Sequence, residues 1–120
     1  MKRFTFTLER AASWRRMLRD RERANLEKLY ADRSDLDQQR DRIGLHRDET
    51  AKEIANGPFL DAYTVATLPQ WQKRTAASLV AISGQRLQLE ARIELQQTKV
   101  REAERQVKLL ERIREGRYAA

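Results

Sequence analysis

The sequence predicts an all-α protein, an antiparallel two-helix coiled-coil hairpin, and three observations support this fold class. The chain of 120 residues contains only four glycines and two prolines, so few positions can interrupt a helix. Charged residues make up 36% of the chain and the mean hydropathy is -0.84, which suits long helices that bury a narrow stripe. Apolar residues also recur at heptad spacing. We therefore expect a single coiled-coil domain over residues 1–120.

The first helix is expected over about residues 7–56. Asn56-Gly57-Pro58 marks its end, because a glycine there can adopt the left-handed conformation and proline cannot continue the helix. A connector over residues 57–67 follows. The sequence Thr67-Leu68-Pro69-Gln70 has the features of a helix start, with threonine as the cap and glutamine completing a capping box. The second helix is therefore expected over about residues 68–118.

The second helix has the clearer heptad pattern. Its a positions are Leu79, Arg86, Ile93, Val100 and Val107, and its d positions are Ile82, Leu89, Gln96, Ala103 and Leu110. Eight of these ten residues are apolar. We call the a and d positions that face the other helix the seam, and expect this stripe to form one half of it.

The first helix keeps the same spacing with more polar residues. Its a positions are Leu26, Arg33, Arg40, Arg47 and Ile54, and its d positions are Leu29, Leu36, Ile43 and Thr50. Nearer the N-terminus, Ala11, Trp14 and Leu18 predict a stutter that shifts the register. A turn near residues 63–64 would place Gly44 level with Gly84, which suggests either a close backbone approach or a shared flexible point. Two independently tolerated glycines are the alternative.

The positive charge is concentrated where the two termini of the hairpin would meet. Residues 1–23 contain eight basic and three acidic side chains, and residues 99–120 contain seven and four, within a chain of net charge +7. Most of the cations are arginines, which suit bidentate contacts with carboxylates or phosphates. The aromatic residues gather near the termini (Phe4, Phe6, Trp14, Tyr118) and near the turn (Phe59, Tyr63, Trp71). Both ends are thus candidates for partner contacts, although mixed charges along helices also form ordinary solvated surfaces.

Several classes of function are excluded by what the sequence lacks. Without cysteine there is no disulfide, thiol nucleophile or thiolate metal site, and His46 alone does not make a metal site. No P-loop, GxGxxG or GxSxG motif is present, so we expect no catalysis, cofactor or metal. No apolar run has the length of a signal peptide or a membrane span, which favours a soluble cytoplasmic protein.

Both ends of the chain resemble the ends of FliJ-type flagellar export proteins. The similar stretches are Phe4-Thr5-Phe6-Thr7-Leu8-Glu9-Arg10 and Arg105-Gln106-Val107-Lys108-Leu109-Leu110-Glu111-Arg112-Ile113-Arg114-Glu115. The resemblance implies a non-enzymatic, stalk-like coiled coil of the flagellar type III export apparatus. It implies three partners: the hexameric export ATPase, the export-gate membrane protein and export chaperones. These partners would hold the protein at the cytoplasmic face of the membrane.

The resemblance also implies which residues meet these partners. The terminal end would enter the ATPase ring, which makes its candidate contacts Arg10, Trp14, Arg15, Arg16, Arg19, Arg105, Lys108 and Arg112. The region beside the turn would meet the export gate, with Ile43, Trp71 and Leu79 as candidates.

Three other functions remain open from the sequence. The stalk protein of a virulence type III secretion system has the same pattern. A basic coiled-coil module that binds nucleic acid would use the same arginines, although cations and anions alternate along both helices. A membrane-surface helix is the weakest of the three, because the apolar residues are expected in a narrow seam.

Overall fold

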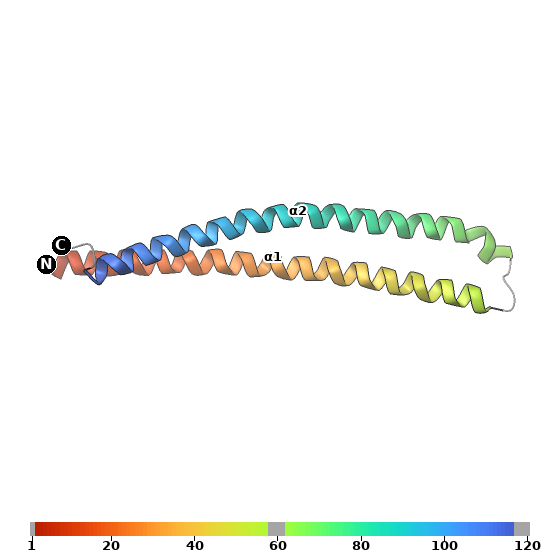
Figure 1. Ribbon diagram of the computed structural model, residues 1–120, viewed down its shortest axis with the longest axis horizontal. Coiled ribbons are helices and arrows are strands. Elements are labelled where there is room, and N and C mark those ends of the chain that lie inside the picture. The colour runs from red at the N-terminus through yellow and green to blue at the C-terminus, as the bar shows by residue number, and fades with distance from the viewer. Residues whose placement is uncertain (1, 58–61, 117–120) are drawn as a thin grey trace. The chain divides into compact units, whose positions relative to one another are not determined.

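The computed structural model describes residues 2–57 and 62–116. They form two long helices, α1 (Lys2–Asn56) and α2 (Ala62–Arg114) (Figure 1). No strand occurs within these residues. The fold class is confirmed: the protein is an all-α hairpin of two antiparallel helices. Three residues to which the sequence analysis gave a role, Pro58, Phe59 and Tyr118, lie outside the described residues.

The chain divides into two compact units. The terminal unit combines Met1–Ala31 with Ala91–Ala120, and the turn unit is the continuous segment Asp32–Glu90. Within each unit a segment of α1 lies antiparallel to a segment of α2. The expectation of a single domain stays a prediction.

The end of α1 is where the sequence places it, but the conformation of Gly57 is not the expected one. The helix ends at Asn56, as expected. Gly57 does not adopt the left-handed conformation; its importance is steric, because a Cβ atom there would lie 2.9 Å from the carbonyl oxygen of Glu53. The left-handed glycine is Gly116, with φ of 77°, which follows the last turn of α2. A glycine therefore follows each helix, in the left-handed conformation only at Gly116.

The predicted helix starts and the second helix end are wrong. α1 already begins at Lys2, and α2 begins at Ala62, six positions before the expected start, and ends at Arg114. Thr67 lies inside α2, where its hydroxyl donates to the carbonyl oxygen of Tyr63 at 3.0 Å, so it is not a cap. Pro69 is the eighth residue of α2 and lies inside the helix. Residues 67–70 therefore lie inside α2 and do not begin it.

The α2 seam is confirmed in the terminal unit. Ile93, Val100 and Val107 are buried, and Ala103 and Leu110 are half-buried. Gln96 is buried too, and its side-chain Nε2 donates to both the carbonyl oxygen (2.9 Å) and the carboxylate (2.6 Å) of Glu22. A polar side chain is tolerated there because α1 provides its acceptors.

Of the three residues that predicted a stutter in α1, Ala11 and Leu18 are half-buried and Trp14 is exposed, so the seam assignment of Trp14 is wrong. Ala12 is 1% exposed, whereas Trp14 is 55% exposed. Ala12, Arg19 and Leu26 continue a single heptad register, and the last two are half-buried. The small side chain of Ala12 therefore faces α2, while the indole of Trp14 lies outside the seam.

In the turn unit the seam is less well covered. Ile82 and Leu89 are buried, and the other predicted seam residues of α2, Leu79 and Arg86, are half-buried. Their counterparts on α1 are half-buried, namely Arg33, Leu36, Ile43, Thr50 and Ile54. Arg40 and Arg47 are exposed, which corrects their assignment to the seam. Arg40 instead pairs with Asp37 and Asp41 on its own helix, because its long side chain can keep the guanidinium in water.

A cluster of charges joins the two helices of the turn unit. Arg86 Nε donates to Asp37 Oδ1 at 2.8 Å, and Arg33 Nη1 donates to Glu90 Oε1 at 3.1 Å. The hydrogen bond from Arg86 lowers the pKa of Asp37 below its ordinary value, since it favours the carboxylate form. These pairs fix which residues lie opposite each other.

Gly44 and Gly84 are not level with each other. The pairs Asp37–Arg86 and Arg33–Glu90 both join residues whose numbers add up to 123, which places Gly44 near Leu79. A Cβ atom at either glycine would meet nothing within 4 Å, so no close approach of backbones explains them.

Replacing Gly44 and Gly84 with alanine is expected to stabilise the protein. Each substitution should add up to about 1 kcal/mol to the free energy of unfolding, because both glycines lie inside helices with open space around them. Urea denaturation followed by circular dichroism measures the change. Gly57→Ala is the control, and it should destabilise because of the contact with Glu53; stabilisation by Gly57→Ala would contradict the geometry.

Candidate partner-binding surfaces

One side of α2 in the terminal unit carries four cations at spacings of four, three and four residues. We call Arg101, Arg105, Lys108 and Arg112 the α2 ridge; all four are exposed. Together with Glu104 and Leu109 they line a surface hollow of about 410 Å³. The structure thus brings together three predicted ATPase contacts and adds Arg101, which helical spacing from Arg105 could have identified.

The predicted arginines of α1 do not form a single surface. Arg15 is exposed, Arg16 is half-buried, and Arg19 lies at a seam position, where it pairs with Asp20 at 3.1 Å. Charge reversal at Arg19 would therefore disturb helix packing as well as any partner contact. Of these three arginines, Arg15 is the one fully available to a partner.

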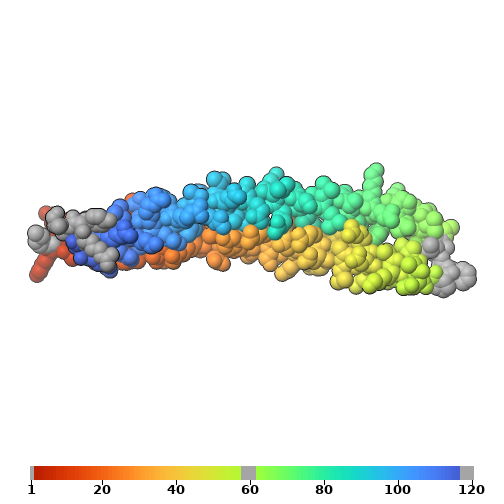
Figure 2. All heavy atoms as spheres, viewed as in Figure 1, coloured from red at the N-terminus to blue at the C-terminus, as the bar shows by residue number. Residues whose placement is uncertain are grey.

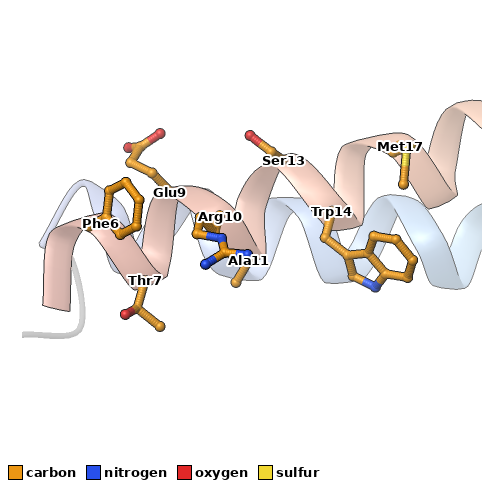
Figure 3. A pocket seen from close by; sticks show the side chains of 8 residues that line it. All are labelled: Phe6, Thr7, Glu9, Arg10, Ala11, Ser13, Trp14 and Met17. Atoms are coloured by element: carbon orange, nitrogen blue, oxygen red, sulfur yellow. The ribbon is translucent and has the colours of Figure 1, made fainter. Parts of the chain in front are cut away.

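A second surface of the terminal unit lies on α1 and is largely apolar. The side chains of Phe6, Trp14 and Met17 are 65%, 55% and 54% exposed, and the guanidinium carbon of Arg10 lies 5.9 Å from the centre of the Phe6 ring. Figure 3 shows these side chains along α1, with α2 behind the helix. They line a shallow hollow that is formed by α1 alone. Phe6 and Met17 were missed as site residues; their positions one helical turn before Arg10 and after Trp14 were the available signal.

The three residues predicted to meet the export gate lie in the turn unit and are half-buried. Ile43 and Leu79 occupy seam positions, and the ring of Trp71 makes an edge contact with His46, with 6.2 Å between ring centres. Part of each side chain therefore packs within the turn unit, and only the remainder is accessible to a partner. Val80 and Leu87 on α2 are 72% and 73% exposed and were missed.

The described residues hold no obvious chemical centre. Within residues 2–57 and 62–116, no group of histidine or acidic side chains could hold a metal ion. Over the same ranges, neither helix has an apolar stretch long enough to cross a bilayer.

Comparison with known proteins identifies no relative: no family model, curated protein or solved structure matches the chain.

Proposed function

We propose that this protein is a non-catalytic, stalk-like component of the flagellar type III export apparatus that binds the export ATPase through its terminal unit. The structural observation that supports a docking role is the α2 ridge, where four exposed cations share one side of a helix. The resemblance of Phe4–Arg10 and Arg105–Glu115 to FliJ-type ends supports the particular apparatus. In this proposal the turn unit contacts the export gate through Ile43, Trp71 and Leu79, and export chaperones are a third partner.

The ridge suits an acidic partner surface for electrostatic reasons. Exposed like charges attract a complementary surface over a distance limited by salt, so they raise the rate of encounter and weaken at high ionic strength. The arginines among them can also form bidentate contacts with carboxylates. The expected partner surface is therefore a ring lined with aspartate and glutamate.

Reversing three charges of the ridge tests this proposal. The variant Arg105→Glu/Lys108→Glu/Arg112→Glu is expected to weaken binding to the cognate export ATPase on the order of 100-fold, taking about 1 kcal/mol for each reversed surface charge. Isothermal titration calorimetry measures the affinity, and the stimulation of ATP hydrolysis by the parent protein gives a second readout. The protein alone should not hydrolyse ATP.

A matched variant controls for net charge. Arg42→Glu/Lys52→Glu/Lys73→Glu changes the same charge at three exposed positions of the turn unit and should bind the ATPase like the parent. Equal ATPase affinity of the parent and the folded ridge variant would contradict the proposal.

Two alternative functions are each supported by a specific observation. A virulence type III secretion stalk fits the same resemblance, and neighbouring injectisome genes would favour it. A nucleic-acid module fits the ridge itself, although Glu104 lies in the same hollow. RNA binding that falls with the ridge variant, together with no ATPase binding by the parent, would favour that module.

A further inference from the structure

The outer side of α1 in the terminal unit alternates apolar residues with arginines. We call Arg3, Phe6, Arg10, Trp14, Met17 and Arg21 the α1 outer face; all six are exposed. Successive members are three or four residues apart, so they follow one side of the helix. With Ala12 and Arg19 at seam position a, they occupy positions b, c and f, which point away from the seam. α2 therefore leaves this face uncovered.

The beginning of α1 is exposed on all sides. Arg114, in the last turn of α2, pairs with Glu9 at 3.4 Å. Residues 2–7 continue beyond this level, and each of them is exposed, including Phe4. In Figure 2 the red atoms of these first turns extend past the blue atoms of α2. Phe4 and Phe6 thus stand on a projecting helical end that also carries Lys2 and Arg3.

We propose that the α1 outer face, with the projecting end, binds an anionic lipid surface. Residues 1–23 carry a net charge of +5, which complements acidic headgroups. Phe6, Trp14 and Met17 provide apolar area for the boundary between headgroups and acyl chains, where aromatic side chains are favoured. The arginines between them have long aliphatic stems, so each guanidinium can reach the phosphates while its stem lies along the apolar side chains.

The shape of the face favours lipid over a macromolecular partner. The hollow beside Phe6 and Trp14 is shallow and lined by α1 alone, so it has no second wall to hold an inserted side chain or an extended strand. A lipid surface adapts to the side of a single helix, which can lie in the interface with its axis parallel to the membrane plane. Single-stranded nucleic acid would need aromatic rings at the spacing of successive bases, but Phe6 and Trp14 are eight residues apart, about 12 Å along the helix.

The lipid contact is separate from the proposed ATPase contact, because it uses α1 and leaves the α2 ridge free. It reassigns Arg10 and Trp14 from the ATPase surface to the lipid surface. It also corrects the expectation that the apolar residues of this helix are confined to the seam, since Phe6, Trp14 and Met17 lie outside it.

The fluorescence of Trp14 provides a direct test. The chain has two tryptophans, so Trp71→Phe leaves Trp14 as the only reporter. With vesicles of phosphatidylcholine and phosphatidylglycerol in equal amounts, its emission should shift to shorter wavelength as the indole leaves water. Pure phosphatidylcholine vesicles should give a much smaller shift at the same lipid concentration. An unchanged emission with the anionic vesicles would overturn the proposal.

Two sets of substitutions in this background separate the apolar and charged contributions. Phe6→Ser/Met17→Ser should weaken vesicle binding by about tenfold or more, because it removes apolar area from the face. Arg3→Gln/Arg10→Gln/Arg21→Gln should weaken binding to the anionic vesicles on the order of 100-fold, since each basic residue near such a surface contributes about fivefold. If either variant binds the anionic vesicles as tightly as the Trp71→Phe protein does, the assignment of the α1 outer face to lipid is wrong.

Controls in other parts of the chain complete the test. Val80→Ser/Leu87→Ser removes two exposed apolar side chains from the turn unit and should leave vesicle binding unchanged. The ridge variant Arg105→Glu/Lys108→Glu/Arg112→Glu should lose the ATPase and keep the Trp14 shift, so failure of one proposal is distinguishable from failure of the other. If the parent does not bind vesicles and Phe6→Ser/Met17→Ser abolishes ATPase binding instead, the face binds protein and the lipid proposal is wrong.

Discussion

Replacing Ile93 with alanine is expected to lower the free energy of unfolding by about 2–4 kcal/mol. Ile93 is 2% exposed and is the largest side chain of the described residues that is almost completely buried. The substitution removes apolar contacts and leaves space that two facing helices can fill only in part. A two-helix pair has no second layer of core residues to compensate. Urea denaturation followed by circular dichroism measures the loss.

Leu95→Ala is the matched control for this prediction. Leu95 is two residues from Ile93 on the same helix and is 68% exposed, so the same kind of truncation should change the stability by no more than about 0.5 kcal/mol. Similar losses at the two positions would contradict the orientation of α2 in the terminal unit.

The seam of α2 could be predicted from sequence because its large apolar residues are also its inward residues. Ile93, Val100 and Val107 follow the heptad and are buried as expected. The pattern even identified Gln96 as a seam position, since the neighbouring apolar residues define the register around it. What the pattern could not show is the acceptor, because Glu22 lies on the other helix, far away in the sequence.

The seam of α1 could be predicted only in part, because the large side chain of Trp14 is exposed whereas the small side chain of Ala12 is buried. Trp14 and Leu18 were the most apolar residues of their segment, so a pattern based on hydrophobicity shifted the register toward them. Leu18 is half-buried, but Trp14 is exposed. The inward positions also hold Ala12, Arg19 and Glu22, which no hydrophobic pattern marks. Because Trp14 was assigned to the seam, the α1 outer face was not predicted.

The helix boundaries show a second limit of local reasoning. Thr67 and Pro69 are favourable at a helix start, but both are also compatible with a helix that began earlier. Threonine can bond back to the preceding turn. Pro69 has no N–H to donate to the carbonyl oxygen of Val65, so α2 continues through it at the cost of one backbone hydrogen bond. Capping residues thus indicate where a helix can begin, but α2 begins at Ala62 because the residues before Thr67 are helical as well.

The register of α1 leads to the second large expected effect: Ala12→Asp should destabilise the terminal unit by about 2–4 kcal/mol, whereas Trp14→Ala should cost no more than about 0.5 kcal/mol. Ala12 is 1% exposed, so a carboxylate at this position is removed from water. Ser13→Asp, at an exposed neighbour, controls for the helix propensity of aspartate. Thermal denaturation and amide hydrogen exchange measure global and local losses. If Trp14 were the seam residue, the order of the two effects would be reversed, because truncating a buried tryptophan costs about 3–5 kcal/mol.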